Sequence, residues 1–349
     1  MMLLRPYERI ISGDAKGLLA LFARLFLSLL TLLYLVALLC RRLLYRMRLI
    51  RTHKVELPVV SVGNITLGGT GKTPCVAALA KMLQKRGLKV AVLMRGYGAS
   101  VDGVSEEAAE LKRLLPDVPV YCDKNRVRSA KKAKEDGADV VILDDGFQHW
   151  RIRRDLDIVL VDATNPFGYG YLFPRGLLRE WPSALRRADL IILTRSDIPP
   201  TATKLVTIAA IKRFAHNTPI IEAVHKPKHF LRIPKGKTKA PSWFKGKKVL
   251  AFCGVGNPAA FLMTLTMMGI KVAAFHGFSD HQRYHGRLVG ALEEQAKKLK
   301  CAAMVTTLKD AVKLTHYDFS VPLYALEIEF AIVKGKEELE RRLYEVVGV

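Results

Sequence analysis

Five short apolar runs, separated by segments of helical spacing, limit what this chain can fold into. They are Val59–Val62, Lys89–Met94, Asp139–Leu143, Ile158–Val161 and Leu190–Thr194. Each run is continuously apolar rather than alternating, which indicates a strand buried on both faces. Strands of this kind that alternate with helices are typical of a parallel sheet covered by helices on both sides. The sequence therefore predicts a doubly wound α/β domain.

The last third of the chain has the features of a second, smaller α/β domain. From Ile233 to Gly246, proline, glycine and lysine collect without periodicity, which is typical of a linker or an exposed loop. Beyond it, "KKVLAFCGVGNP" and "KCAAMVTTLKDAVKL" each place an apolar run before a glycine turn or a helix. We therefore expect a main domain over 55–232, a linker over 233–246 and a smaller domain over 247–349.

An apolar segment, Gly17 to Cys40, precedes these domains. It carries one charge, Arg24, and is long enough to cross the hydrocarbon core of a bilayer. Six Lys or Arg residues lie between Arg41 and Lys54, the pattern of a juxtamembrane segment that faces an anionic surface from the cytoplasm. We expect residues 1–54 to form a membrane-associated hydrophobic helix with a basic flank, either crossing the membrane or lying in its interface.

The formal net charge of +24 over 349 residues predicts a polyanionic partner. Because the basic cluster directly follows the apolar segment, an anionic membrane surface or a phosphorylated substrate fits better than nucleic acid. No basic module with interleaved aromatic residues is present either, so no nucleic-acid partner is expected. The five cysteines are scattered without a C-x-x-C pair, which argues against a disulfide framework and a zinc knuckle.

"SVGNITLGGTGKTP", Ser61 to Pro74, has the ending of a phosphate-binding loop. Its glycines allow backbone N–H groups to surround phosphate oxygens at the start of a helix. Lys72 would reach the β- and γ-phosphates, and the Thr73 hydroxyl would bind Mg²⁺. The usual pattern begins with glycine, whereas this loop has Thr66 at that position. The stretch follows a predicted strand and precedes a helical pattern, so we interpret it as a nucleotide site of the P-loop NTPase type.

"VVILDDGFQHW" places Asp144 and Asp145 at the carboxyl end of a predicted strand, where ligands bind in open α/β sheets. Two adjacent carboxylates at the end of a buried strand are costly unless a cation or hydrogen-bond donors satisfy them. Together with the phosphate-binding loop, they predict the second half of a Mg²⁺–nucleotide site.

Two further patterns leave alternatives open. His281 and His285 have the i, i+4 spacing of a metal pair on a helix, but no third ligand is evident; Asp280–His281 is equally consistent with a supported general base or with surface residues. "LTRSD", Leu193 to Asp197, stands where GTPases read guanine, with Arg195 in place of lysine. A helix cap at Asp197 is the plainer interpretation.

Seven motifs occur in order along the chain: "SVGNITLGGTGKTP", "RGYG", "LDDGFQH", "PRGLLRE", "AFCGVGNP", "FSDH" and "KDAVKL". Together they resemble the tetraacyldisaccharide 4'-kinase family of lipid A biosynthesis, over nearly the whole chain. The resemblance implies ATP- and Mg²⁺-dependent phosphorylation of the 4'-hydroxyl of a lipid A disaccharide precursor. It also implies a location at the cytoplasmic face of the bacterial inner membrane. We expect a monomer.

The resemblance also implies roles for individual residues. It implies that the loop and the Gln-His pair after the two aspartates bind the nucleotide. It also implies that one loop hydroxyl and both aspartates bind the metal. Lys72, Arg179 and His281 match catalytic positions, with Arg179 neutralising charge on the transferred phosphoryl group. The nucleotide-binding positions are Thr66, Gly68, Gly69, Thr70, Gly71, Lys72, Thr73, Gln148 and His149, and the metal positions are Thr73, Asp144 and Asp145.

The catalytic base is the point of departure from the family. The family has Gly-Asp-Glu after Arg-Gly-Tyr-Gly, and the best match here is Ser105-Glu106-Glu107. Glu106 would then be the base, one methylene longer than aspartate, and Asp102 is its rival. Leu308 stands where the family often has glutamate. The competing hypothesis for the whole chain is a membrane-recruited P-loop ATPase or GTPase switch that phosphorylates no small molecule.

Overall fold

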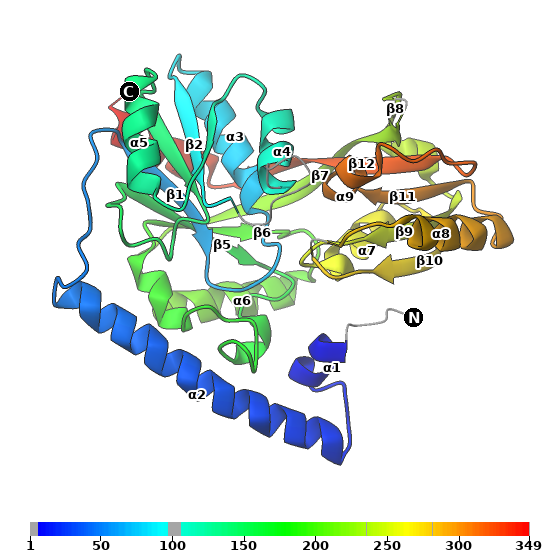
Figure 1. The fold of residues 1–349 in the computed structure, drawn as a ribbon, viewed down its shortest axis with the longest axis horizontal. Coiled ribbons are helices and arrows are strands. Elements are labelled where there is room, and N and C mark those ends of the chain that lie inside the picture. Colours follow the sequence, from blue (N-terminus) through cyan, green and yellow to red (C-terminus); the bar gives the residue numbers. More distant parts are fainter. Residues whose placement is uncertain (1–5, 97–105, 235, 281, 349) are drawn as a thin grey trace. The chain divides into compact units, whose positions relative to one another are not determined.

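The computed structural model describes residues 6–96, 106–234, 236–280 and 282–348. The chain divides into two compact units (Figure 1). The larger unit contains residues 9–224 and 330–349, and the smaller unit contains residues 1–8 and 225–329. Two strands, β7 (Ile220–Ile233) and β12 (Leu323–Lys334), have residues in both units.

The larger unit contains a parallel sheet with the strand order β7-β6-β5-β1-β4-β2-β3. Every residue of β1, β2, β4, β5 and β6 is buried, because helices cover both faces of the sheet. This confirms the doubly wound sheet that the continuous apolar runs predict. The strands before β7 are β1 (Val59–Asn64), β2 (Val90–Met94), β3 (Val120–Cys122), β4 (Val140–Asp144), β5 (Leu156–Asp162) and β6 (Leu190–Thr194).

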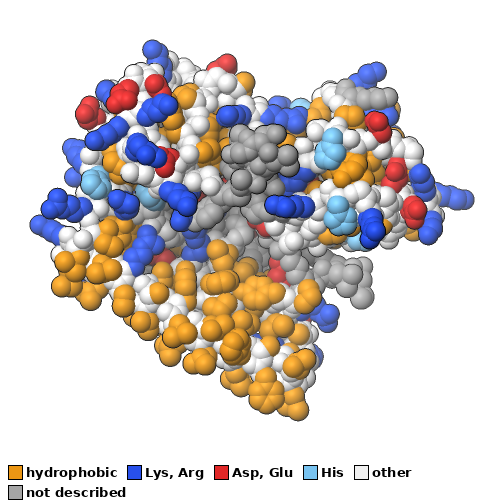
Figure 2. All heavy atoms as spheres, viewed as in Figure 1, with side chains coloured by type: hydrophobic (Ala, Val, Ile, Leu, Met, Phe, Trp, Pro, Cys, Tyr) orange, Lys and Arg blue, Asp and Glu red, His pale blue; other side chains and the backbone are white. Residues whose placement is uncertain are grey.

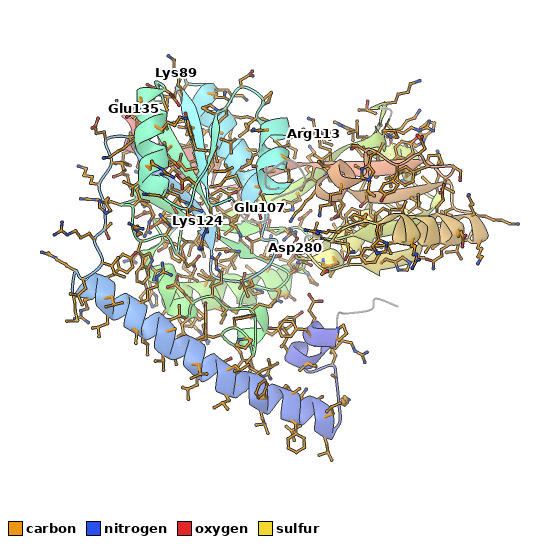
Figure 3. The ribbon with its side chains drawn as sticks, in the orientation of Figure 1. Lys89, Glu107, Arg113, Lys124, Glu135 and Asp280 are labelled. Atoms are coloured by element: carbon orange, nitrogen blue, oxygen red, sulfur yellow. The ribbon has the colours of Figure 1, made fainter. Side chains whose placement is uncertain are left out.

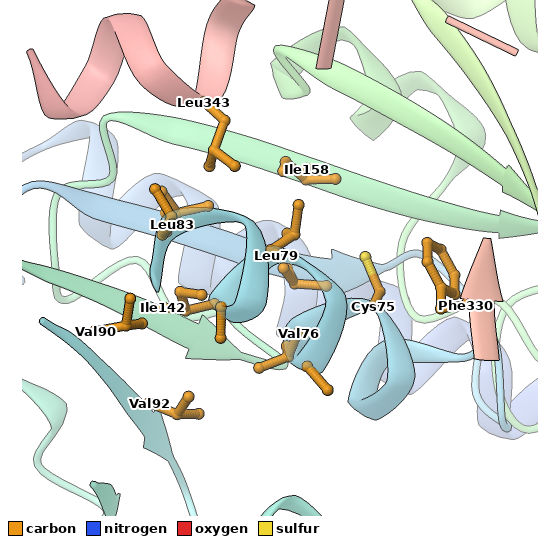
Figure 4. Close-up of a cluster of buried hydrophobic side chains, with 14 of the residues drawn as sticks. Cys75, Val76, Leu79, Leu83, Val90, Val92, Ile142, Ile158, Phe330 and Leu343 are labelled. Carbon is orange, nitrogen blue, oxygen red and sulfur yellow. The ribbon is translucent and has the colours of Figure 1, made fainter. Parts of the chain in front are cut away.

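One large hydrophobic cluster fills the space between this sheet and the helices on one side of it. Figure 4 shows Leu79 and Leu83 of α3 against Ile142 and Ile158 of the sheet, with Leu343 of the C-terminal helix beside them. The helices of the larger unit are α2 (Leu18–Arg46), α3 (Lys72–Gln84), α4 (Glu106–Leu114), α5 (Arg126–Glu135), α6 (Thr201–Phe214) and α10 (Lys336–Val347), with 3₁₀ turns η1 (Gly168–Gly170) and η2 (Pro182–Arg187). The short α1 spans Pro6–Ser12.

The smaller unit has its own parallel strands, in the order β10-β9-β11-β12. Its core is apolar and includes Phe230, Phe244 and Leu265. The remaining strands are β8 (Thr238–Lys239), which pairs antiparallel with β7, β9 (Lys248–Cys253), β10 (Lys271–Gly277) and β11 (Ala303–Thr307). The helices are α7 (Pro258–Met267), α8 (Gly286–Lys298) and α9 (Leu308–Ala311), with 3₁₀ turns η3 (Pro241–Phe244) and η4 (Val312–Leu314).

The division into units differs from the expected boundaries at two places. The expected linker, 233–246, lies inside the smaller unit, where β8 and η3 form and Phe244 is buried. Residues 330–349 belong to the larger unit, because α10 is amphipathic and buries Leu339 and Leu343 in its core. Turn-forming composition marks loops, but only packing shows which core a segment joins.

The apolar N-terminal segment forms the single long helix α2, Leu18–Arg46, which is long and apolar enough to cross a membrane. Most of its large hydrophobic side chains are exposed, among them Phe22, Leu29 and Leu33. Figure 2 shows hydrophobic side chains gathered along α2. Its opposite side packs on the larger unit through Tyr34, Leu35 and Leu38.

Candidate active site

The phosphate-binding loop joins β1 to α3 at the centre of the parallel sheet. Gly68 and Gly71 have φ values of 109° and 90°, the left-handed region that glycine tolerates without strain. Gly71 is the N-cap of α3, so Lys72 and Thr73 form the first turn of that helix. Backbone N–H groups and the positive end of a helix therefore meet at this loop, which is the arrangement that binds phosphate.

Thr66 departs from the usual loop because the chain is extended there and pairs with another segment. Thr66 forms an antiparallel bridge with Leu178. The Leu67 N–H donates to the carbonyl of Leu177 at 2.6 Å, and the Arg179 N–H donates to the carbonyl of Ile65 at 2.7 Å. A residue in this ladder needs no glycine, and the ladder brings Arg179 beside the loop.

Two of the sequence motifs meet at Gly63, in β1. A Cβ atom at this position would lie 2.5 Å from the Cβ of Phe147 and 2.7 Å from its backbone nitrogen. No other residue fits so close to a backbone, so "SVGN" requires glycine where "DDGFQH" packs against it. This contact fixes the two aspartates relative to the loop.

Asp145 forms ion pairs with Lys72 and Arg179. Arg179 forms a bidentate pair with its carboxylate, at 2.6 and 3.1 Å, and the Lys72 Nζ lies 3.6 Å from Oδ1. Burial alone would raise the pKa of Asp145, but Lys72 and Arg179 together hold it well below its ordinary range. Asp145 is therefore ionised at neutral pH, and it holds both cations at the mouth of the loop.

Asp144 has a different environment, although it is the adjacent residue. Its side chain is 4% exposed, and its Oδ1 is buried without a hydrogen-bond partner among the described residues. Burial raises the pKa of Asp144 to about 7, with Glu107 and Asp145 adding to the rise and Lys72 opposing it. An unpaired carboxylate oxygen at the end of a buried strand is a site that a cation would satisfy.

Glu107 of α4 is a carboxylate that sequence reasoning named only as part of the Ser105-Glu106-Glu107 match. Its charge raises the pKa of Asp144, and Figure 3 shows Glu107 on α4. Arg126, the first residue of α5, is a second residue that was missed: it is buried, and its Nη1 donates to the Asp145 carbonyl at 3.2 Å. No motif assigns a role to Glu107 or contains Arg126, because each residue belongs to a helix separate from the loop.

A side-chain network supports the loop from the side. The Asn64 amide donates to the Thr70 hydroxyl at 3.0 Å and accepts from Arg179 at 3.2 Å. The Gln148 amide donates to the Asn64 carbonyl and to Glu180, both at 3.0 Å. Thr70 and Gln148 thus both contact Asn64, beside the loop.

The "LTRSD" motif supports the same loop through two side chains. Arg195, with a φ of 53°, donates to the Gly69 carbonyl at 2.8 Å and pairs with Asp162. The Thr194 hydroxyl donates to the Thr70 carbonyl at 3.0 Å. The expected cap at Asp197 is wrong, because α6 begins at Thr201 with Pro200 at its N-cap.

His149 lies among arginines. Burial, followed by the charges of Arg126 and Arg154, lowers the pKa of His149 to about 4, so the ring is neutral at physiological pH. Its carbonyl accepts from Arg154 at 3.2 Å.

Cys75 is fully buried in the core, where burial raises its thiol pKa, so this residue packs among apolar side chains.

Three predicted site residues lie wholly or partly outside the described residues. Asp102 and His281 lie outside the described residues, and so does the side chain of Glu106, whose backbone begins α4. The idea of a helical metal pair is wrong for His285, which is the N-cap of α8 and accepts from the Leu288 N–H at 3.3 Å. Within the described residues, no group of three His, Cys, Asp or Glu side chains could hold a metal ion.

The motifs of the smaller unit have structural contacts. Asp310 of "KDAVKL" is buried and accepts from the Gly254 N–H at 2.9 Å and the Thr307 hydroxyl at 2.7 Å. Gly254 begins the turn of "CGVGNP". Lys309 pairs with Asp280 at 2.8 Å, and Leu308 is buried. Asp310 thus fixes the turn after β9 to the end of β11.

Comparisons with known proteins agree with this geometry. The family model described as "LpxK: Tetraacyldisaccharide-1-P 4'-kinase" matches residues 23–348. A tetraacyldisaccharide 4'-kinase of Anaeromyxobacter dehalogenans is 39% identical over 323 residues, 87% of this chain and 85% of the relative. One of Syntrophus aciditrophicus is 36% identical over 348 residues, 93% of both chains. A solved structure of LpxK from Aquifex aeolicus in complex with ATP is 29% identical, with a TM-score of 0.70 over 93% of this chain and 99% of that chain.

Proposed function

The chain belongs to the tetraacyldisaccharide-1-phosphate 4'-kinase family, and from this membership we propose that it transfers the γ-phosphate of ATP to the 4'-hydroxyl of tetraacyldisaccharide 1-phosphate. The observation that carries the proposal is the pairing of both Lys72 and Arg179 with Asp145 at the mouth of a phosphate-binding loop. Phosphoryl transfer needs positioning and neutralisation of charge more than covalent chemistry, and this cluster supplies both.

The residues of the loop would hold ATP. Backbone N–H groups from Gly68 to Thr73 would bind the phosphates, and Lys72 would neutralise their charge. Arg179, which matches the family's arginine, would neutralise charge on the transferred phosphoryl group. Because Asp145 forms ion pairs with Lys72 and Arg179, the protein itself would hold both cations in position for the phosphates.

Mg²⁺ fits the residues present. Asp144 offers a buried oxygen that has no hydrogen-bond partner in the described part of the chain, and Thr73 follows the loop lysine as the first turn of α3 begins. Protein sites for Mg²⁺ use one or two carboxylates together with substrate phosphates and water, so a cluster of three acidic residues is not required. When bound, the ion would neutralise charge on the phosphates; Thr73 and Asp144 would hold it, with Asp145 nearby.

The base that accepts the proton of the 4'-hydroxyl is proposed from the family match alone. Glu106 stands at the matched position and Asp102 is the alternative, with His281 as the histidine that would support the carboxylate. Gln148 and Thr66 would act through the loop, the first by its hydrogen bond to Asn64 and the second by its backbone bridge.

The test is transfer of labelled phosphate in detergent. Purified protein, Mg²⁺, labelled ATP and tetraacyldisaccharide 1-phosphate should yield a lipid that gains one phosphate at the 4' position. The variant Lys72→Ala is the matched negative control. Correctly folded protein that makes no labelled lipid would contradict the proposal. ATP or GTP hydrolysis at the same rate with and without the lipid would favour the switch hypothesis instead.

We further propose that the protein is a monomer that works at the cytoplasmic face of the inner membrane, with α2 lying in the interface rather than crossing the bilayer. Contacts with the rest of the larger unit extend along the helix from Thr31, which donates to the Leu172 carbonyl, to Tyr45, which packs against Trp150. This stretch of helix is about 21 Å long at 1.5 Å per residue. The Tyr34 hydroxyl donates to the Arg179 carbonyl at 2.9 Å, and Arg41 donates to the Gln148 carbonyl. A spanning helix would lose these contacts and place their polar groups in hydrocarbon.

The position of the N-terminus tests this arrangement. A protease-sensitive tag before residue 1 should be cleaved from the cytoplasmic side of inverted membrane vesicles, because an interfacial helix keeps both ends on one side. Cleavage only from the opposite side would show that α2 spans the bilayer.

A further inference from the structure

A basic pocket lies at the C-terminal end of α2, and its lining includes none of the nucleotide-site residues. Its volume is about 440 Å³. Five arginines contribute to its wall: Arg42 and Arg46 from the last turns of α2, Arg153 and Arg154 from the segment before β5, and Arg187 at the end of η2. Positive charge from three separate segments of the larger unit therefore converges on one cavity.

Three of the five arginines are available to a ligand. Arg154 and Arg187 pair with carboxylates of the larger unit, at 2.9 and 2.8 Å. Arg42, Arg46 and Arg153 are exposed, and in the part of the chain that the structure describes their side chains have no ion-pair or hydrogen-bond partner. Like charges held together in this way repel one another, and an anion bound among them would relieve that repulsion.

The aromatic part of the wall carries further unsatisfied donors. Tyr45 packs edge-on against Trp150 with ring centroids 5.3 Å apart, and the Arg187 guanidinium lies over the Trp150 ring at 5.0 Å. Within the described chain, the Trp150 Nε1 and the Arg187 Nε are buried without an acceptor. The wall therefore combines guanidinium groups with aromatic rings that pack against them.

Exposed apolar side chains lie on the same part of α2 and the residues that follow it. Leu43, Met47 and Leu49 are 54%, 59% and 66% exposed. A ligand that reached the pocket from this side would meet apolar surface and then guanidinium groups. That sequence of chemistries matches a lipid whose head carries a phosphate.

We propose that this pocket binds the phosphate group of an anionic lipid, as a site separate from the phosphate-binding loop. Guanidinium groups form bidentate, charge-assisted hydrogen bonds with phosphate, and several can share one phosphate. Two lipids carry suitable chemistry: an anionic glycerophospholipid of the membrane, and the substrate through its 1-phosphate. The second source rests on the proposed kinase activity, whereas the first does not.

Binding of a short-chain phosphatidylglycerol below its micelle concentration tests the site. Calorimetry on the full chain compares the double variant Arg46→Gln/Arg153→Gln with Arg48→Gln/Arg51→Gln, which removes the same charge from exposed positions outside the pocket. We expect the pocket variant to lose at least about tenfold in affinity, since each charge-assisted hydrogen bond contributes roughly that factor or more. The control should lose less than twofold. Equal losses would overturn the proposal, because they would show diffuse attraction without a site.

Two further measurements separate the sources of the phosphate. If the pocket holds the substrate, Arg46→Gln/Arg153→Gln raises the KM for the 1-phosphorylated disaccharide but not for its 1-hydroxyl analogue, and phosphatidylglycerol competes with it. If it holds a membrane lipid, KM in detergent is unchanged while binding to phosphatidylglycerol is lost. Inorganic phosphate that binds as tightly as the lipid would refute a lipid site. Because calorimetry needs no turnover, its result does not depend on whether the protein proves to be a kinase.

Discussion

Replacing Asp144 with asparagine should stabilise the protein in the absence of metal, even though it should abolish phosphoryl transfer. Burial raises the pKa of Asp144 from its ordinary value near 4 to about 7, so the folded protein resists ionising it. One pKa unit corresponds to about 1.4 kcal/mol, and the difference of about 3 units therefore makes the ionised carboxylate cost about 4 kcal/mol of folding free energy.

The pH dependence follows from the sign of this change. Below pH 4 the carboxyl is protonated in both the folded and the unfolded protein, so Asp144→Asn should have little effect. Between pH 4 and pH 7 the unfolded chain releases this proton while the folded protein retains it, and the wild type loses stability relative to the variant. Above pH 7 both states are ionised and the advantage of the variant is constant, at up to about 4 kcal/mol.

Urea unfolding in a fixed detergent, with EDTA, measures this advantage between pH 4 and pH 8.5. Asp145→Asn is the matched control with the opposite sign. Lys72 and Arg179 stabilise the ionised form of Asp145, so its replacement should destabilise the protein at neutral pH and should do so less as the solution is made strongly acidic. An Asp144→Asn protein that is no more stable than wild type at pH 8, or a difference independent of pH, would refute the assignment of Asp144 as a buried, uncompensated carboxylate.

Three other substitutions test the site. Lys72→Ala should lower kcat for lipid phosphorylation by at least about 100-fold, since a charged group at the transferred phosphate is lost, with unchanged circular dichroism; near-normal rates would exclude its role. Arg195→Ala should raise the KM for ATP about tenfold, because the charge-assisted hydrogen bond to the Gly69 carbonyl is lost; an unchanged KM would show that the loop needs no such support. Glu106→Gln and Asp102→Asn test the two candidates for the base. The variant that removes the base should change kcat far more than KM and should abolish the fall of kcat at acidic pH. Small and equal effects of the two variants would exclude both residues.

The parallel sheet was predictable because its strands are buried on both faces. Continuous apolar runs are then the only sequences that fit, and β6 has the bounds that its run predicts. The long strands β7 and β12 gave no such signal, since both mix buried residues with exposed charged ones along their length. Helix α10 was assigned to the wrong unit for a related reason: amphipathic spacing predicts a buried face but not the core that receives it.

The candidate site, like the fold, could be predicted only in part. Glycine, lysine and aspartate at the ends of strands could be recognised because phosphate and metal binding require those residue types at fixed spacing. Arg195 and Arg126 could not, since their roles depend on contacts with residues far away in the chain, such as Gly69. Arg179 was named only through the family resemblance, because nothing in its local sequence shows that a backbone ladder places it beside the loop.

That ladder has an evolutionary consequence. The positions of the nucleotide loop and of Arg179 come from the same main-chain hydrogen bonds, between Ile65–Leu67 and Leu177–Arg179. Side chains at Thr66 and Leu178 can therefore vary without moving the arginine, whereas one inserted or deleted residue on either side would shift it by a whole register. Homologues should tolerate substitution here and reject changes of length, which makes spacing a better marker of this kinase than the identity of the residue at the start of its loop.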